Sequence, residues 1–217
     1  MRVITVACLL SLCAFSFSIS LPWYFDPYTG SQTISTPFNS SYPISVEGYH
    51  QNVSILGGER DIQLTAVSAP PQNSFRVSVA GGRFGIATPL NAVANVIYQL
   101  DGVDGSMDLN PNGLKNLDMT VGGLATALNI TVACDNYATM VIFIYGPDNG
   151  QIANYTQSLH VGQFTSFYLV KYASFMMSGV GNFSDVGAIE IQYNKLQGAD
   201  VNVYGISIIK IKRRVLK

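Results

Sequence analysis

Four side chains that carry oxygen ligands lie close together in one glycine-containing stretch: Asp101, Asp104, Asp108 and Asn110. Carboxylate and amide oxygens on a bendable backbone are the donors that Ca²⁺ prefers. The spacing differs from that of an EF-hand loop, and no glutamate closes the stretch. It therefore indicates either a structural calcium site or a set of Asp-Gly turns in which each carboxylate caps its own backbone. No other cofactor is expected.

Side chains suited to catalysis are scarce. The chain has two histidines, His50 and His160, and shows no G-x-S-x-G sequence or recognisable order of Ser, His and Asp. Zinc chemistry needs three or four Cys or His ligands, and the few candidates here lie far apart in the sequence. Glu190 and an aspartate would offer the paired carboxylates of a glycoside hydrolase, but its flanking isoleucines predict an outward strand residue. We therefore expect no enzyme, and a hydrolase ranks third among the functions considered.

Aromatic side chains suggest a second kind of site. Four of the twelve tyrosines, Tyr137, Tyr155, Tyr168 and Tyr172, fall in or beside predicted strands and loops. Sugar-binding sandwiches present flat rings to the apolar face of a pyranose, with amides and carboxylates nearby. These tyrosines are therefore either ligand-binding residues or rings that line the edge of the core.

The N-terminus predicts export. Residues 1–20 comprise a basic start at Met1-Arg2, an apolar run and small residues at alternate positions, which together are typical of a secretory signal peptide. Cleavage is expected after Ser20, with Ser16 as the alternative. An uncleaved anchor is the other interpretation, but the run is shorter than the roughly 20 apolar residues that span a bilayer. We therefore expect a secreted, extracellular protein without a membrane span after cleavage.

Modification sites and cysteine usage fit that route. Cleavage would leave Cys134 as the sole cysteine, either a buried small hydrophobe or the donor of an intermolecular disulfide. Five tripeptides match the acceptor for N-glycosylation, which favours a eukaryotic secretory route. Their asparagines are Asn39, Asn52, Asn129, Asn154 and Asn182. Asn129 alternates with apolar residues, so a glycan there would cover the outer face of a strand.

Basic residues are concentrated at the C-terminal end, where residues 212–217 form a basic tail behind a more acidic body. The tail is either a solvated end, a contact for an acidic partner or a dibasic processing site at Arg213-Arg214. A short tail on an acidic body argues against binding to nucleic acid.

Hydrophobic periodicity predicts an all-β protein. Residues 21–45 are rich in Pro, Ser and aromatics without a clear period and are expected to form an extended N-terminal arm, which either covers the sandwich or docks on another subunit. Residues 46–211 alternate between short apolar runs and turns, which predicts about nine or ten strands in an antiparallel β-sandwich of jelly-roll type. The clearest runs are Asp61–Thr65, Ser74–Val79, Val93–Leu100, Leu128–Cys134, Ala138–Tyr145, Thr165–Val170, Gly187–Tyr193 and Asp200–Ile211.

The order of three motifs carries a family resemblance. Gly57–Asp61 opens a strand, Tyr98–Ser106 reads YQLDGVDGS, and Val186–Ile191 is followed by Gly198–Val203. This layout resembles the β-sandwich ectodomains of bacterial exported proteins that carry a PEP-CTERM sorting tail, although a basic stub stands here in place of that tail. The resemblance implies a sandwich fold and a role at a surface or in a matrix.

These observations favour a secreted, non-enzymatic structural or adhesive component of a cell surface, wall or extracellular matrix. Its partner would be an extracellular protein or polysaccharide, or a second copy bound through the N-terminal arm. The alternative is a lectin-like carbohydrate-binding module.

Overall fold

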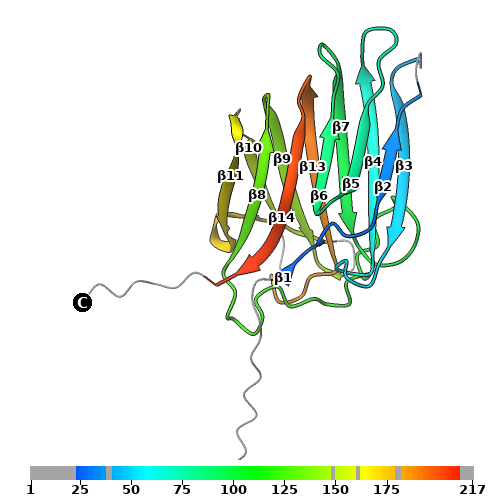
Figure 1. Ribbon diagram of the computed structural model, residues 1–217. Coiled ribbons are helices and arrows are strands. Elements are labelled where there is room, and N and C mark those ends of the chain that lie inside the picture. Colours follow the sequence, from blue (N-terminus) through cyan, green and yellow to red (C-terminus); the bar gives the residue numbers. More distant parts are fainter. Residues whose placement is uncertain (1–22, 38–40, 148–149, 160–161, 179–181, 211–217) are drawn as a thin grey trace, which may run out of the picture.

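Two antiparallel sheets of seven strands each pack face to face as a β-sandwich (Figure 1). The computed structural model describes residues 23–37, 41–147, 150–159, 162–178 and 182–210. Sheet A contains, in spatial order, β11 (Gly162–Lys171), β8 (Ala127–Cys134), β14 (Val201–Ile209), β6 (Arg83–Ala87), β5 (Arg76–Ala80) and β2 (Gln32–Ser35), with β1 (Trp23–Tyr24) paired to β14. Sheet B contains β12 (Met176–Met177), β10 (Gln151–Leu159), β9 (Ala138–Tyr145), β13 (Ala188–Gln197), β7 (Val93–Leu100), β4 (Glu59–Ser68) and β3 (Ile44–Gln51).

Alternating side chains build the core between the sheets. In β8, Leu128, Ile130 and Val132 are buried while the residues between them are partly exposed. Because successive side chains of a strand point to opposite faces, this pattern assigns one face of each sheet to the core and the other to solvent. The predicted all-β sandwich is thus confirmed, and the predicted bounds of β7 and β9 match the structure.

The N-terminal segment is extended, and its described part packs on the sandwich of its own chain. β1 pairs with β14, and β2 pairs with β5 at the edge of sheet A. Phe25 and Tyr28 are buried between these pairings and belong to the core. The described part of residues 21–45 thus covers the sandwich of its own chain, which is one of the two arrangements expected.

A buried ion pair fastens this segment to sheet B. Asp26 and Arg60 are both almost completely buried, and Nη1 of Arg60 donates to Oδ2 of Asp26 over 2.8 Å. The Tyr98 hydroxyl donates to the same oxygen, and the Arg60 Nε donates to Oε1 of Gln32. The core therefore contains a polar connection between the N-terminal segment, β4 and β7.

Three substantial strands lie outside the strongest predicted runs: β3, β6 and β10. β3 lies at the edge of sheet B and is exposed or half-buried along its whole length. Because none of its residues is fully buried, it does not need the strong apolar alternation by which the other strands were predicted. In β9 the inward residues are buried and the outward ones are half-buried.

The helical content of the described residues is small and includes a 3₁₀ turn at Tyr172–Ser174. None of the described helices has the length and apolar character needed to cross a bilayer. Cys134 is a free, buried cysteine at the end of β8, which confirms the prediction that it lies in the core. The predicted signal peptide, the C-terminal tail, His160 and Asn39 lie outside the described residues.

Candidate functional site

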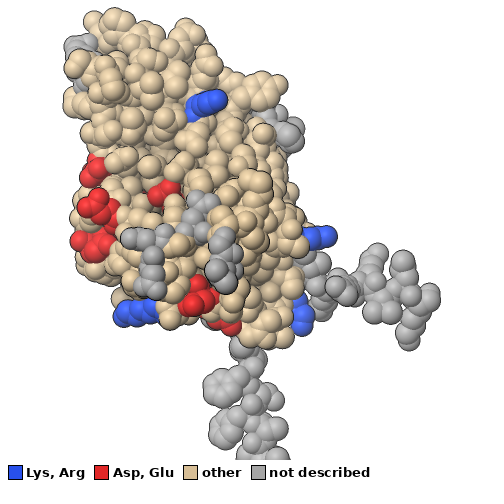
Figure 2. Space-filling model, turned by 180° about the vertical axis from the view of Figure 1, so that it is seen from behind, with Lys and Arg blue, Asp and Glu red and all other residues tan. Residues whose placement is uncertain are grey.

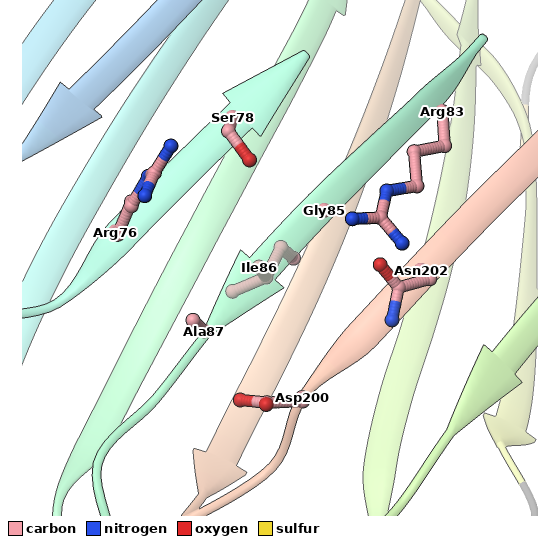
Figure 3. A pocket seen from close by; sticks show the side chains of 8 residues that line it. All are labelled: Arg76, Ser78, Arg83, Gly85, Ile86, Ala87, Asp200 and Asn202. Atoms are coloured by element: carbon pink, nitrogen blue, oxygen red, sulfur yellow. The ribbon is translucent and has the colours of Figure 1, made fainter. Parts of the chain in front are cut away.

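A groove of about 280 Å³ crosses the outer face of sheet A (Figure 3). Its centre is a cross-strand row formed by Ser78 on β5, Gly85 on β6 and Asn202 on β14. Ser78 and Gly85 face each other across the β5–β6 hairpin, and the pairing of β14 with β6 brings Asn202 beside them from a distant part of the sequence. The complete lining is Arg76, Ser78, Arg83, Gly85, Ile86, Ala87, Asp200 and Asn202.

Gly85 keeps the floor of the groove low. A Cβ at this position would lie 3.2 Å from Oδ1 of Asn202 and 3.6 Å from Oγ of Ser78. Any larger residue would therefore crowd the amide and the hydroxyl that line the groove. A glycine within a strand often marks a place where another molecule approaches the backbone closely.

Two arginines lie on either side of this row, displaced from it along the strand direction. Arg83 lies two residues before Gly85 on β6, and Arg76 lies two residues before Ser78 on the antiparallel β5. With a rise of about 3.4 Å per residue, their backbones are separated by roughly 14 Å along the strand direction. Both side chains are exposed, and within the described part of the chain neither guanidinium has an ion-pair or hydrogen-bond partner. The groove thus offers two free guanidinium groups.

The groove lining includes one carboxylate, that of Asp200. Its Oδ1 accepts a hydrogen bond from the backbone N–H of Thr88, and its own N–H donates to Oδ1 of Asp135. Glycoside hydrolysis needs two carboxyl groups across the scissile bond. The lining thus holds one of the two carboxyl groups that this chemistry uses, among the described residues.

Exposed rings lie on the same outer face of sheet A. Gly205 leaves room for Tyr24, whose Cε1 lies 3.2 Å from the place of a Cβ on Gly205. Tyr24 is 54% exposed and Tyr204 is 42% exposed. Phe167 is 72% exposed on β11, where it pairs with Thr131 of β8. These rings could not be grouped from the sequence, because only the strand order brings them to one face.

The four tyrosines singled out from the sequence lie elsewhere. Tyr155, Tyr168 and Tyr172 are half-buried and pack against the core, and Tyr172 stacks on Phe183 at a centroid distance of 4.4 Å. Tyr137 is 76% exposed in the turn between β8 and β9. Three of the four therefore line the edge of the core, which is the alternative that the sequence left open.

The described glycosylation acceptors are distributed over the surface. Asn129 lies on the outward side of β8, as predicted, and so shares its face with the groove. Asn154 lies on the outward side of β10, opposite Phe143. Asn52 and Asn182 lie in turns, where each accepts a hydrogen bond from the hydroxyl of the serine two residues later.

The predicted calcium-binding stretch is brought together only in part. A carboxylate oxygen of Asp101 and one of Asp104 lie within 4.8 Å of each other and of an oxygen of Asp61 on β4. Asp108 is outside this group, and Asn110 contributes its backbone N–H, which donates to Oδ2 of Asp101 over 2.8 Å. Asp61 was missed, since only the pairing of β4 with β7 brings it near Asp101.

Asp61, Asp101 and Asp104 are called the acidic cluster, and burial raises the pKa of two of its members, Asp61 and Asp101. Burial, reinforced by the charges of Glu59 and Asp101, raises the pKa of Asp61 to about 9. Burial also raises the pKa of Asp101 to about 6, against the opposing effect of the hydrogen bond from Asn110. The charged forms of these groups therefore need compensation.

Glu190, the glutamate considered for catalysis, points outward from β13 as predicted. Its carboxylate accepts hydrogen bonds from Nε2 of Gln99 and Nε2 of Gln192. Neighbouring side chains leave it only 7% exposed. Glu190 is thus part of a network of hydrogen bonds on sheet B.

No protein-family model matches the chain, and no curated protein matches it. Among solved structures, a family 11 carbohydrate-binding module of the cellulosomal cellulase Lic26A-Cel5E of Clostridium thermocellum shares 12% identity at a TM-score of 0.42, over 91% of this chain and 99% of that one. A family 29 module, CBM29-2, complexed with mannohexaose shares 9% identity at a TM-score of 0.35, over 82% and 92% of the two chains. PfGH50B shares 15% identity at a TM-score of 0.42, over 69% of this chain and 22% of that one.

Proposed function

We propose that this protein is a non-catalytic, extracellular binding module for a polysaccharide that carries acidic groups. The observation that carries the proposal is a pair of arginines in the groove on sheet A, Arg76 and Arg83, that have no partner among the residues the structure describes. Guanidinium groups bind carboxylate and sulfate oxygens through two parallel hydrogen bonds, which gives both affinity and orientation.

The rest of the groove suits the sugar rings between such groups. The amide of Asn202 and the hydroxyl of Ser78 can donate to and accept from sugar hydroxyls. The low floor at Gly85 lets a chain approach the sheet, and the separation of the arginines suits an oligosaccharide rather than one ring. Exposed aromatic rings on the same face, such as Tyr204, can pack on the apolar side of a sugar.

This function is the alternative that the sequence left open. Binding a polysaccharide would also attach the protein to a surface, wall or matrix, which is where the structural or adhesive role was expected. Adhesion through the N-terminal segment has less support, because β1 and β2 already pair within the same chain. The predicted signal peptide agrees with an extracellular polysaccharide as the partner.

Affinity electrophoresis through gels containing polygalacturonate or alginate, with a neutral glucan as the comparison, tests the proposal. We expect Arg76→Ala and Arg83→Ala each to weaken binding to the acidic polymer about tenfold or more, since hydrogen bonds to charged groups contribute about 1.5–3 kcal/mol. Lys171→Ala, which removes a positive charge from β11 outside the groove, should bind as the parent does.

The variants carry Asn129→Gln as well, so that no glycan on the outer face obstructs the groove. Equal retardation by acidic and neutral polymers would contradict the proposal. So would an equal loss of binding in Lys171→Ala and the two arginine variants, because that result would indicate a general effect of charge.

A further inference from the structure

The acidic cluster on the outer face of sheet B has the geometry of a cation site. Asp61 comes from β4, Asp101 directly follows β7, and Asp104 lies in the loop after it. One carboxylate oxygen from each residue lies within 4.8 Å of the others. Calcium–oxygen distances are about 2.3–2.6 Å, so two ligands of one Ca²⁺ lie at most about 5 Å apart. The three oxygens therefore lie close enough to share one ion.

The strongest indication is a set of buried oxygens without hydrogen-bond donors. Asp61 is completely buried, and neither of its carboxylate oxygens has a partner among the described residues. Asp101 is equally buried; its Oδ2 accepts the Asn110 N–H while its Oδ1 has no partner. Two facing carboxylates can satisfy each other only if one keeps a proton. A buried charge without compensation is strongly unfavourable, so these oxygens require a proton or a cation.

Among the described residues, no Lys or Arg forms an ion pair with the cluster. Arg60 lies between Glu59 and Asp61 in the sequence, but alternation along β4 sends its side chain to the opposite face, into the core. The Arg60–Asp26 pair is the one ion pair within the described ranges. Glu59 adds a further carboxylate, and its Oε2 accepts the backbone N–H groups of Asp104 and Gly105. Figure 2 shows acidic side chains gathered on this side of the molecule.

The loop that covers the cluster is held in place by backbone contacts. Gly113 packs directly on the carbonyl of Asp101, where a Cβ would lie 1.3 Å from the oxygen. Gly102 has a φ of 103°, a conformation that favours glycine at the point where the chain leaves β7. These contacts hold the backbone at the end of β7, from which the Asp101 carboxylate reaches the cluster.

We propose that Asp61, Asp101 and Asp104 bind a Ca²⁺ ion that ties the loop after β7 to the outer face of sheet B. The donors are all oxygens, which suits a hard cation and disfavours zinc. Both oxygens of Asp61 are available, so the side chains offer up to four ligands, and water can complete the six to eight that Ca²⁺ takes. Mg²⁺ demands a stricter octahedron at shorter distances, which is harder to build from three separate carboxylates.

Calorimetric and thermal titration of the purified full-length protein with CaCl₂, after treatment with EDTA, tests this site. We expect one ion per chain and a rise in Tm of about 5 to 10 °C when free Ca²⁺ reaches a hundred times its Kd. Asp61→Asn should abolish the response, and Asp104→Asn, an exposed residue that folding tolerates, should weaken binding at least tenfold. Asp108→Asn is the matched control, because it removes one charge from the same loop outside the cluster, and it should bind as the parent does.

A second measurement distinguishes a binding role from a merely structural one. Without metal, Asp61→Asn replaces a buried carboxyl group by an amide of similar size that needs neither a proton nor a cation, so its Tm in EDTA should equal or exceed that of the parent while its calcium response is lost. The proposal is overturned if the parent shows neither heat nor a shift in Tm, or if the Asp61, Asp104 and Asp108 variants respond alike. An equal response to MgCl₂ would overturn the choice of calcium.

Discussion

Removing the Asp26 carboxylate should destabilise the protein more than most single substitutions. Asp26 accepts hydrogen bonds from Arg60, from the Tyr98 hydroxyl and from the backbone N–H of Tyr28, at 2.8, 2.6 and 2.7 Å. Asp26→Ala deletes all three acceptor contacts at once. The Arg60 guanidinium would stay buried with the Gln32 side chain as its remaining partner.

The size of the effect follows from the burial of both partners, which are 0% and 1% exposed. Breaking a buried pair by removing one partner costs about 3–5 kcal/mol, because the other charge is left uncompensated. For a domain of this size each kcal/mol lowers Tm by roughly 2–4 °C, so Asp26→Ala should lower Tm by about 6 to 20 °C. Replacing both partners with apolar residues removes the uncompensated charge, so Asp26→Leu with Arg60→Met should be considerably more stable than Asp26→Ala.

Urea unfolding of the parent, Asp26→Leu, Arg60→Met and the double variant forms a double-mutant cycle, and following it by tryptophan fluorescence and circular dichroism gives the coupling energy directly. Asp108→Ala, at an exposed position, serves as the control and should change stability by less than about 0.5 kcal/mol. A loss below about 1 kcal/mol in Asp26→Ala would refute the reasoning. A double variant no more stable than Asp26→Ala would refute it equally, because the pair would then not be coupled.

Titration and thiol reactivity provide two more checks. In EDTA, Asp61 and Asp101 should make stability depend on pH. Their raised pKa values of about 9 and about 6 let the folded state keep protons that the unfolded chain releases. Their contribution to stability should therefore be greatest below pH 3.8, the ordinary pKa of Asp, and should fall as pH rises toward about 9. Thermal melts at pH 5, 7 and 8.5 measure this slope, and Asp61→Asn should flatten it; identical slopes in the two proteins would contradict the assignment. Burial raises the pKa of the Cys134 thiol, so a thiol reagent at pH 7.5 should label the folded protein far more slowly than the protein in guanidinium, and equal rates would contradict the buried position.

The sandwich could be predicted because apolar and polar residues alternate along many of its strands. β7 and β9 bury every second residue along most of their length, so period and composition were enough to place both strands. The N-terminal segment could not be placed in the same way. β1 has two residues and β2 has four, and both depend on pairing with strands that come much later in the chain.

The candidate sites show the same division between local pattern and strand pairing. Asp101 and Asp104 are close in the sequence and were predicted together, whereas Asp61 joins them only through the register of β4 with β7. The charged alternation in β4, where Glu59 and Asp61 flank Arg60, was the one local signal that this strand carries acidic groups on its outer face. The β5–β6 hairpin places Ser78 beside Gly85, but Asn202 joins them only through the pairing of β14 with β6, so no local pattern indicates the complete groove.

The two sites lie on opposite outer faces of the sandwich, and this separates their roles. The groove belongs to sheet A, whereas Asp61 and the loop after β7 belong to the far side of sheet B, with the whole core between them. A bound cation there cannot touch a ligand in the groove, so its effect should be on the stability of the sandwich and not on the contacts of the ligand. Asp61→Asn should therefore lose the calcium response and keep its affinity for acidic polysaccharide. Arg83→Ala should keep the calcium response and bind acidic polysaccharide more weakly. A single cause such as misfolding would remove both properties in both variants, so the crossed pattern attributes each property to its own face.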